Sequence, residues 1–342
     1  MYSESDLNQA VEAGVMSPEA ATAFRDHVAL SRSAPAVDEE SFRLLTGFND
    51  IFVSIALTLL LVAIAQIGER IAEPMAGVGV AVASWLLAEY FTRARRMALP
   101  SILLLLAFVG GVAASLVGLM VRIDPDLSDQ QNAAILAGIA AVAAGAAYLH
   151  WRRFMVPITV AAGAVAAVGV VVGLIFAAIP LDESALYPIA LVAGLAVFAL
   201  AMWWDMSDRE RRTRRSDVAF WLHLAAAPLI AHSVFQMLGV FGADITPATG
   251  IVVMLLYVGF GFVALAVDRR ALLVSSLAYV LYAMYALFTK AGALELSAAL
   301  TALVIGSALL TLSAFWHPMR AMVVGTLGGL QHRLPPIALQ TV

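Results

Sequence analysis

The side chains in this sequence that could do chemistry lie inside long apolar segments, where an ionisable or amide group is costly unless it faces other helices or water. Residues 217–241 hold His223, His232 and Gln236 around Pro228, which removes a helical hydrogen bond and predicts a kink. His232 and Gln236 share a face near the middle of the segment, and His223 points the other way. The pattern fits a proton relay or a polar substrate contact in a broken helix. It also fits a kinked packing helix in which His232 bonds a neighbouring helix.

A polar stripe runs along the start of residues 48–67, with Thr46, Asp50, Ser54 and Thr58 at intervals of four residues and Asn49 beside Asp50. Positions four residues apart drift by about 40° around a helix, so the stripe stays within one sector of the helix surface. It predicts a hydrophilic path or an ion contact. The alternative is that Asn49 and Asp50 lie at the cytoplasmic interface, while the hydroxyl groups bond back to their own helix.

Two glutamates near the ends of apolar segments are further candidate polar sites. Glu89 precedes Arg93 by four residues, a spacing that predicts an ion pair at the membrane interface. Glu295 has a similar position near the outer end of the last segment, with Lys290 as its candidate partner. Both positions are more typical of interfacial ion pairs than of a transport path.

Signatures of enzymes and of cofactor sites do not appear in the sequence. Because there is no cysteine, disulfides, zinc–thiolate sites, iron–sulfur clusters and thiol catalysis are excluded. No P-loop, nucleophile elbow, zinc-protease helix or dinucleotide fingerprint is present. Asp124, Asp126 and Asp129 lack the glycine and the final glutamate of a calcium loop. We therefore predict no catalytic residue, metal or cofactor. We also predict no nucleic-acid binding, because the arginine clusters lie where membrane topology places them.

These side chains must be positioned by helices that cross a membrane. The 342 residues are 62% hydrophobic and 13% charged, against about 25% charged in a soluble domain. The apolar residues come in runs of about 20, the helix length that crosses a hydrocarbon core of roughly 30 Å. The sequence predicts an all-α, polytopic membrane bundle of about ten transmembrane helices, near residues 48–67, 73–92, 98–121, 131–149, 155–180, 186–204, 217–241, 248–267, 271–289 and 292–315.

The arginines test this topology independently, because cytoplasmic loops collect Arg and Lys. With ten spans and both termini inside, the outer side keeps only Arg70, Arg122 and Lys290. A missed helix would reverse every later loop and destroy the asymmetry. We therefore expect a cytoplasmic helical segment and linker at 1–47, a transmembrane bundle at 48–316 and a cytoplasmic tail at 317–342. The acidic start without a signal peptide, and the use of Arg over Lys, favour a bacterial cytoplasmic (inner) membrane.

The inner turns resemble one another, since paired arginines recur at nearly even intervals at Arg95–Arg96, Arg152–Arg153, Arg214–Arg215 and Arg269–Arg270. The pattern fits a two-helix hairpin repeated four times. It also fits the positive-inside rule alone. Gly169 and Gly173 form a G-x-x-x-G pair that predicts close helix packing.

The N-terminal segment begins with a short helix, and Ser17-Pro18-Glu19 is a start signal for a second helix. This beginning, with Gly14-Val15-Met16-Ser17-Pro18-Glu19-Ala20, a polar linker and an alanine-rich multi-span region, resembles an uncharacterised bacterial family of predicted membrane proteins of unknown function. The resemblance implies the architecture and no activity.

Two classes of function follow. The first is a transporter-like or channel-like protein, with the polar faces of 48–67 and 217–241 in the bundle interior. The alternative is a non-transporting scaffold or sensor, in which the acidic residues 1–30 bind a cytoplasmic partner. In that case the spans anchor the chain in the lipid bilayer or form a homo-oligomer. An intramembrane enzyme is the least favoured class, because no paired carboxylates or metal-ligand cluster appear.

Overall fold

The computed structural model describes residues 4–32, 48–123, 126–209, 211, 213–239, 247–290, 297–329 and 334–335, and these residues form helices and turns without any strand. Two compact units make up the chain. One contains Met1–Phe42 with Ala338–Val342, and the other contains Arg43–Ile337.

The small unit is a pair of helices, α1 (Glu4–Glu12) and α2 (Pro18–Arg32). Gly14 joins them with a left-handed φ of 70°, a conformation that glycine adopts at little cost. Ser17 Oγ accepts a hydrogen bond from Ala20 N at 3.2 Å. This bond satisfies one of the first N–H groups of the helix. The predicted start of the second helix at Pro18 is therefore confirmed.

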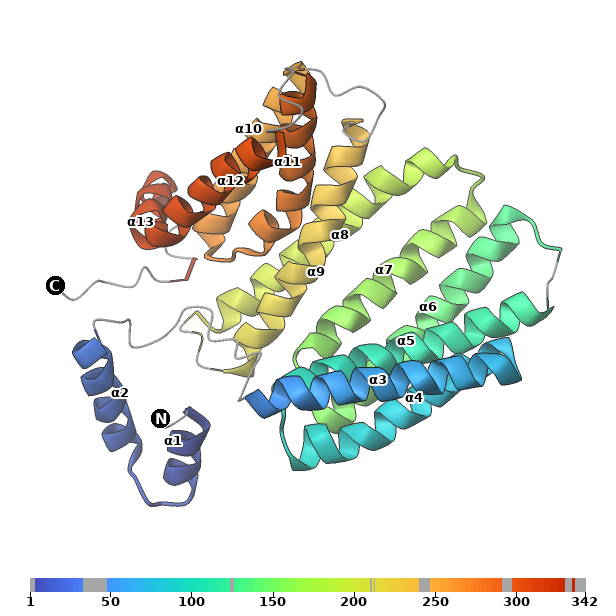
Figure 1. Cartoon of the computed structure of the whole chain (residues 1–342), viewed down its shortest axis with the longest axis horizontal. Helices are drawn as coiled ribbons and strands as arrows, with labels where there is room; N and C mark the ends of the chain where they lie inside the picture. The colour runs from blue at the N-terminus through green and yellow to red at the C-terminus, as the bar shows by residue number, and fades with distance from the viewer. Residues whose placement is uncertain are drawn as a thin grey trace. The chain divides into compact units, whose positions relative to one another are not determined.

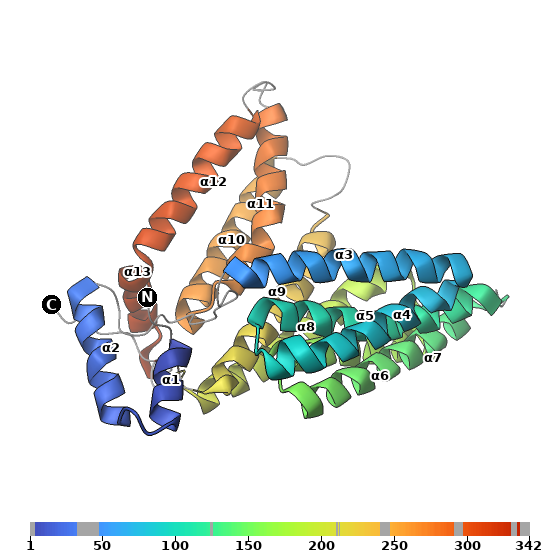
Figure 2. The ribbon, with the colours of Figure 1, turned by 60° about the horizontal axis from the view of Figure 1, so that its bottom comes forward.

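The large unit contains one helix in each of the ten predicted apolar segments (Figures 1 and 2). In chain order the helices are α3 (Phe48–Ile71), α4 (Glu73–Ala88), which continues into the π-helical turn η1 (Glu89–Ala94), α5 (Ala98–Ile123), α6 (Asp129–Phe154), α7 (Ile158–Ala178), the short 3₁₀ turn η2 (Glu183–Ala185), α8 (Leu186–Ser207), α9 (Arg214–Met237), α10 (Pro247–Val267), α11 (Ala271–Lys290), α12 (Ser297–Ala314) and α13 (Trp316–Thr326).

Among the described residues, eight helices are long and apolar enough to cross a membrane. The bent pair α12–α13, with an angle of 77° between its halves, is a ninth candidate, and α11 has a shorter apolar stretch at Ala271–Tyr285. The chain is thus a multi-pass helical membrane protein, and the count of ten stays a prediction. The predicted C-terminal tail begins within α13, which packs against α10 and α12 and buries Trp316, Arg320 and Val324.

Consecutive helices pack as hairpins, with the most extensive contacts in α4–α5, α6–α7 and α8–α9 (Figure 1). The turns on the arginine-rich side, called the inner end below, share one backbone feature. Each contains a non-glycine residue with positive φ: Arg96, Met155, Arg211 and Asp268, at 53°, 55°, 53° and 61°. This conformation costs a non-glycine residue roughly 1–2 kcal/mol. The positive-inside rule does not require it, so its recurrence favours the repeated-hairpin interpretation.

Small residues let the paired helices approach closely. A Cβ atom on Gly111 of α5 would lie 2.8 Å from the backbone nitrogen of Ala81 in α4. A Cβ atom on Gly173 of α7 would lie 3.0 Å from the carbonyl oxygen of Ala133 in α6, and one on Gly169 would lie 3.2 Å from the Cβ of Ala140. The packing role predicted for the Gly169–Gly173 pair is therefore confirmed.

The α9 helix differs from its prediction in two respects. It runs without a break from Arg214 to Met237, through Pro228. One face of the helix is buried along its length, and this packing holds it together although proline removes one backbone bond. The broken helix proposed from the sequence is therefore wrong. Because α9 ends at Met237 rather than at 241, His232 also lies only about a turn and a half from its outer end.

Candidate functional site

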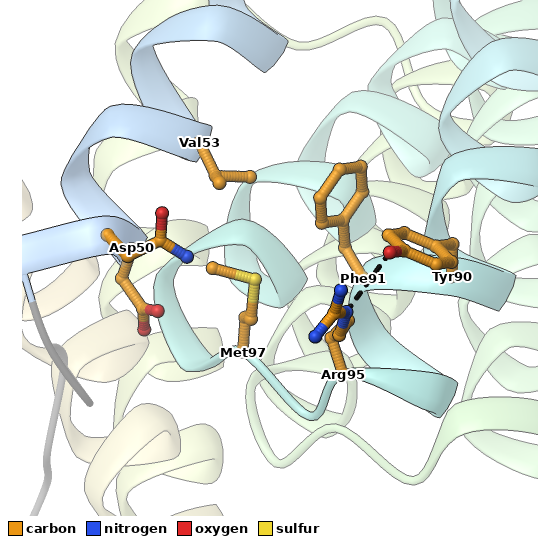
Figure 3. Close-up of a pocket in the computed structure, with 7 residues that line it drawn as sticks. Asp50, Val53, Tyr90, Phe91, Arg95 and Met97 are labelled. Carbon is orange, nitrogen blue, oxygen red and sulfur yellow. Dashed lines mark hydrogen bonds between the residues drawn. The ribbon is translucent and has the colours of Figure 1, made fainter.

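A pocket of about 460 Å³ opens between the first turn of α3 and the end of α4 (Figure 3). In Figure 3 the side chains of Asp50 and Val53 lie across Met97 from those of Phe91 and Arg95. The lining residues combine a carboxylate, a guanidinium, an amide and a phenol with apolar groups. They are Asn49, Asp50, Val53, Tyr90, Phe91, Arg95 and Met97.

The π-helical turn η1 positions one wall of this pocket. Arg95 N donates to Tyr90 O, five residues back, at 2.9 Å, and Met97 N donates to Phe91 O at 3.0 Å. Arg96 follows with its left-handed φ of 53°. The Nε of Arg95 also donates to the Tyr90 hydroxyl at 3.1 Å, as Figure 3 shows. A π-helical turn inserts an extra residue into a helix and is frequent at functional sites. Its effect in this chain is to direct Tyr90, Phe91 and Arg95 into the pocket.

The residues of the predicted polar stripe on α3 have different surroundings in the structure. Asp50, which is 3% exposed, lines the pocket. Ser54 is half-buried, and its hydroxyl oxygen has no hydrogen-bond partner among the described residues. Thr58 is exposed and donates back to Ser54 O at 2.8 Å. The stripe therefore does not form one hydrophilic path, because the hydroxyl of Thr58, at its far end, bonds to the backbone of its own helix.

Glu89 begins η1 and holds two arginines beside the pocket wall. Arg153 at the end of α6 donates to both of its carboxylate oxygens, at 2.7 and 2.9 Å. The predicted pair with Arg93 is present at 3.4 Å. The closer partner was not predicted, because Arg153 lies 64 residues away in the sequence.

His150 of α6 is a buried histidine that the sequence analysis missed. Its Nδ1 lies 3.3 Å from the Thr159 hydroxyl of α7, and its Nε2 has no hydrogen-bond partner among the described residues. The rings of Trp85, Phe108 and Phe154 surround it at centroid distances of 6.2, 5.9 and 4.6 Å. Phe154 lies one turn after His150 on α6, but Trp85 and Phe108 come from α4 and α5, so spacing along the sequence does not reveal the buried environment of His150.

His232 bonds a neighbouring helix, as the packing interpretation of α9 expected. Its Nδ1 lies 2.8 Å from the Tyr279 hydroxyl of α11, and its ring lies 6.0 Å from that of Tyr187 in α8. Gln236, one turn further along α9, is half-buried. Asp50 lines the pocket and His232 does not. Glu295, the remaining candidate, lies outside the described residues.

A buried group of charges, called the inner cluster below, joins the C-terminal helices at their inner end. Asp205 at the end of α8 accepts two hydrogen bonds from Arg269, from Nη2 at 2.6 Å and from Nε at 3.2 Å. The Nε2 of His223 in α9 lies 3.1 Å from the same carboxylate. Arg269 also donates to the hydroxyl and the carbonyl oxygen of Ser216, at 3.2 and 3.3 Å.

Asp268, the residue before Arg269, completes the inner cluster. Arg211 donates to one carboxylate oxygen of Asp268 at 2.9 Å, and Trp316 Nε1 donates to the other at 2.8 Å. Arg320 Nε lies 3.4 Å from that second oxygen, and Arg320 Nη2 donates to the carbonyl oxygen of Pro335 at 2.6 Å. Burial, and then the charge of Arg269, lowers the pKa of the Arg211 guanidinium, which still remains protonated.

The members of the inner cluster were mostly not predicted. The sequence predicts His223 as a candidate, but the positive-inside rule predicts the arginines only as topology signals, and no motif marks Asp205 or Asp268. Their partners lie 18 to 64 residues away along the chain. An aspartate at the end of an apolar segment, such as Asp205, was the available signal, since a buried carboxylate must find a cation.

Comparisons with known proteins find no matching family model, no similar curated protein and no similar solved structure. Over the part of the chain that the structure describes, no three His, Asp or Glu side chains come together as a metal site. The pocket and the inner cluster are therefore the structural features that bear on function.

Proposed function

We propose that the chain is a transporter-like protein of a bacterial cytoplasmic membrane, with ten spans and both termini cytoplasmic. The arginine-rich turns at one end of the bundle support this orientation. The eight long apolar helices, together with α11 and the bent α12–α13 pair, can supply the ten spans. The pocket between α3 and η1 is the proposed solute site.

The π-helical turn at the pocket carries this proposal. It holds Tyr90, Phe91 and Arg95 opposite Asn49 and Asp50, at the cost of an irregular helix and a strained Arg96. Charged and apolar groups line the same space, as in binding sites for polar solutes that carry an apolar part. Under the proposed topology this pocket opens at the cytoplasmic side, where an inward-facing transporter would exchange its solute.

A thermal-shift screen of the purified protein with amino acids, amines and organic acids tests the proposal. A solute that binds only the folded state at 100 times its Kd stabilises it by about 2.7 kcal/mol. Asp50→Asn should abolish that stabilisation, and flux of the same solute into proteoliposomes should also be lost. Asp129→Asn is the matched control, because Asp129 lies in the first turn of α6, is exposed and does not line the pocket. Unchanged binding and flux in Asp50→Asn would rule out the pocket as the solute site.

The scaffold or sensor remains the second candidate, because α1 and α2 belong to a compact unit of their own. This unit exposes the apolar side chains of Val15 (81%) and Phe24 (40%), which a cytoplasmic protein could cover. Deleting residues 1–30 should leave membrane insertion intact and remove partner binding. Light scattering of the purified protein tests self-association of the spans. Solute flux that is unaffected by the deletion would favour the transporter.

A further inference from the structure

The inner cluster ties together three stretches of the chain that are separate along the sequence, from α8 to α9, around the turn between α10 and α11, and in α13. The tied segments are the end of α8, the loop that follows it, α9, the turn between α10 and α11, and α13. Their contributions are Asp205, Arg211, Ser216 with His223, Asp268 with Arg269, and Trp316 with Arg320. The contacts of this cluster therefore hold the inner ends of the C-terminal helices together at one place.

The same helices have a separate apolar core further along their length. Ala231 and Phe235 of α9 pack with Val253 of α10, Val280 of α11 and Ile305 of α12. A second apolar cluster joins α8 and α9 through residues such as Val197 and Leu222. These two cores do not include the charged residues, so they can stay packed while the inner ends separate. The smaller apolar cluster of Ala227, Ala271 and Leu272, which packs the start of α11 against α9, has to separate together with the charges.

The charges make the inner cluster a two-state element. Asp205, Asp268, Arg269 and Arg320 are each at most 4% exposed, and the cluster holds three guanidinium groups against two carboxylates. Removing one partner would leave a buried charge unpaired, which is the least favourable arrangement. Either all the partners stay together or water replaces them together. Arg269 is central, because it bonds both Asp205 of α8 and Ser216 of α9.

We propose that the inner cluster is a gate, closed in this structure, with Arg269 as the residue that holds it shut. When Arg269 leaves Asp205 and Ser216, the turn between α10 and α11 moves away from α8 and α9. Water then reaches the buried face of α9 around Ala219 and His223. This inference does not rest on the solute pocket, and its test requires no solute.

Cysteine accessibility measures the opening directly, because the chain contains no cysteine of its own. Ala219→Cys places a thiol one turn before His223, at a position with 0% exposure. Ser207→Cys, at an exposed position, is the reference for reagent access. The full-length protein is labelled with a membrane-impermeant maleimide in inside-out vesicles. In the Asp205→Asn/Arg269→Gln double variant, Ala219→Cys should react at least about tenfold faster than in the parent, and Ser207→Cys should be unchanged.

Two comparisons keep the experiment decisive. Arg215→Gln removes an inner arginine whose side chain is exposed, and it should leave the labelling of Ala219→Cys at the parent rate. The double variant leaves neither member of the pair charged, so it should fold, as judged by a monodisperse elution profile and an unchanged helical signal. A folded double variant that protects Ala219→Cys as well as the parent does would overturn the gate. A double variant that fails to fold would also overturn it, because the cluster would then be required for folding.

Discussion

Replacing one member of the Asp205–Arg269 pair should destabilise the protein more than replacing both members together. Arg269→Gln leaves the Asp205 carboxylate, which is 1% exposed, without its two guanidinium bonds at 2.6 and 3.2 Å. Hydrogen bonds to charged groups contribute about 1.5–3 kcal/mol each. Breaking a buried ion pair by removing one partner costs about 3–5 kcal/mol. We therefore expect Arg269→Gln to lower the free energy of unfolding by about 3–5 kcal/mol.

The double variant Asp205→Asn/Arg269→Gln should cost less than the two single variants together. No buried charge of this pair is then left without its partner, and two neutral amides replace it. Residues that share one network deviate from additivity by about 0.5–3 kcal/mol, and we expect the upper part of that range. Unfolding by SDS in mixed micelles, followed by tryptophan fluorescence and circular dichroism, gives the four free energies that the cycle needs.

The pair of Glu89 and Arg153 is the matched control for this cycle. It has similar distances, 2.7 and 2.9 Å, but its side chains are 33% and 41% exposed. Exposed pairs are weakened by solvent and by side-chain entropy, so the coupling between Glu89 and Arg153 should be clearly smaller. Additive costs at Asp205 and Arg269, or a coupling no larger than that of the control, would refute the reasoning from burial.

Three further outcomes can be checked. Gly111→Ala should destabilise the α4–α5 hairpin by about 1–3 kcal/mol, because its Cβ would meet the Ala81 backbone at 2.8 Å. The neighbouring Gly110→Ala, which meets nothing within 4 Å, should be neutral or stabilising in the same unfolding assay. Reporter fusions after 95, 152, 212 and 270 should report the cytoplasm and those after 124, 183 and 244 the outside, and two adjacent loops on one side would contradict the ten-span topology. His232→Leu should leave solute stabilisation intact in the thermal-shift assay, since His232 does not line the pocket, and a loss would extend the site to α9.

Local patterns in the sequence were enough to predict the helices and some of their contacts. The start of α2 follows from Ser17 and Pro18, because capping depends on a few neighbouring residues. The Gly169 contact with α6 follows from a motif within one turn. Pro228 shows the limit of such patterns, since the surrounding helices keep α9 continuous where proline alone favours a break.

The candidate site was harder to predict, because its contacts join distant segments. Asp50 was identified from its place in an apolar segment, but Tyr90 and Arg95 were not, since the π-helical turn that directs them has no recognised signal in the sequence. Arg153 and His150 depend in the same way on helices that meet only in the folded chain. Hydropathy fixes where a helix runs, whereas these contacts depend on how the helices pack around one another.

The inner arginines satisfy one topology rule and yet have two physical roles. Arg95, Arg96 and Arg152 are exposed at the N-terminal turns, where hydration suits a topology signal. Arg211, Arg269 and Arg320 are buried at the C-terminal turns, where the carboxylates of Asp205 and Asp268 balance charge that would otherwise be costly to bury. Replacing an exposed arginine should therefore affect insertion more than stability, and replacing a buried one should do the reverse. The two roles also separate the two proposed sites, because the proposed solute pocket is lined by the exposed Arg95 whereas the proposed gate is built from buried arginines.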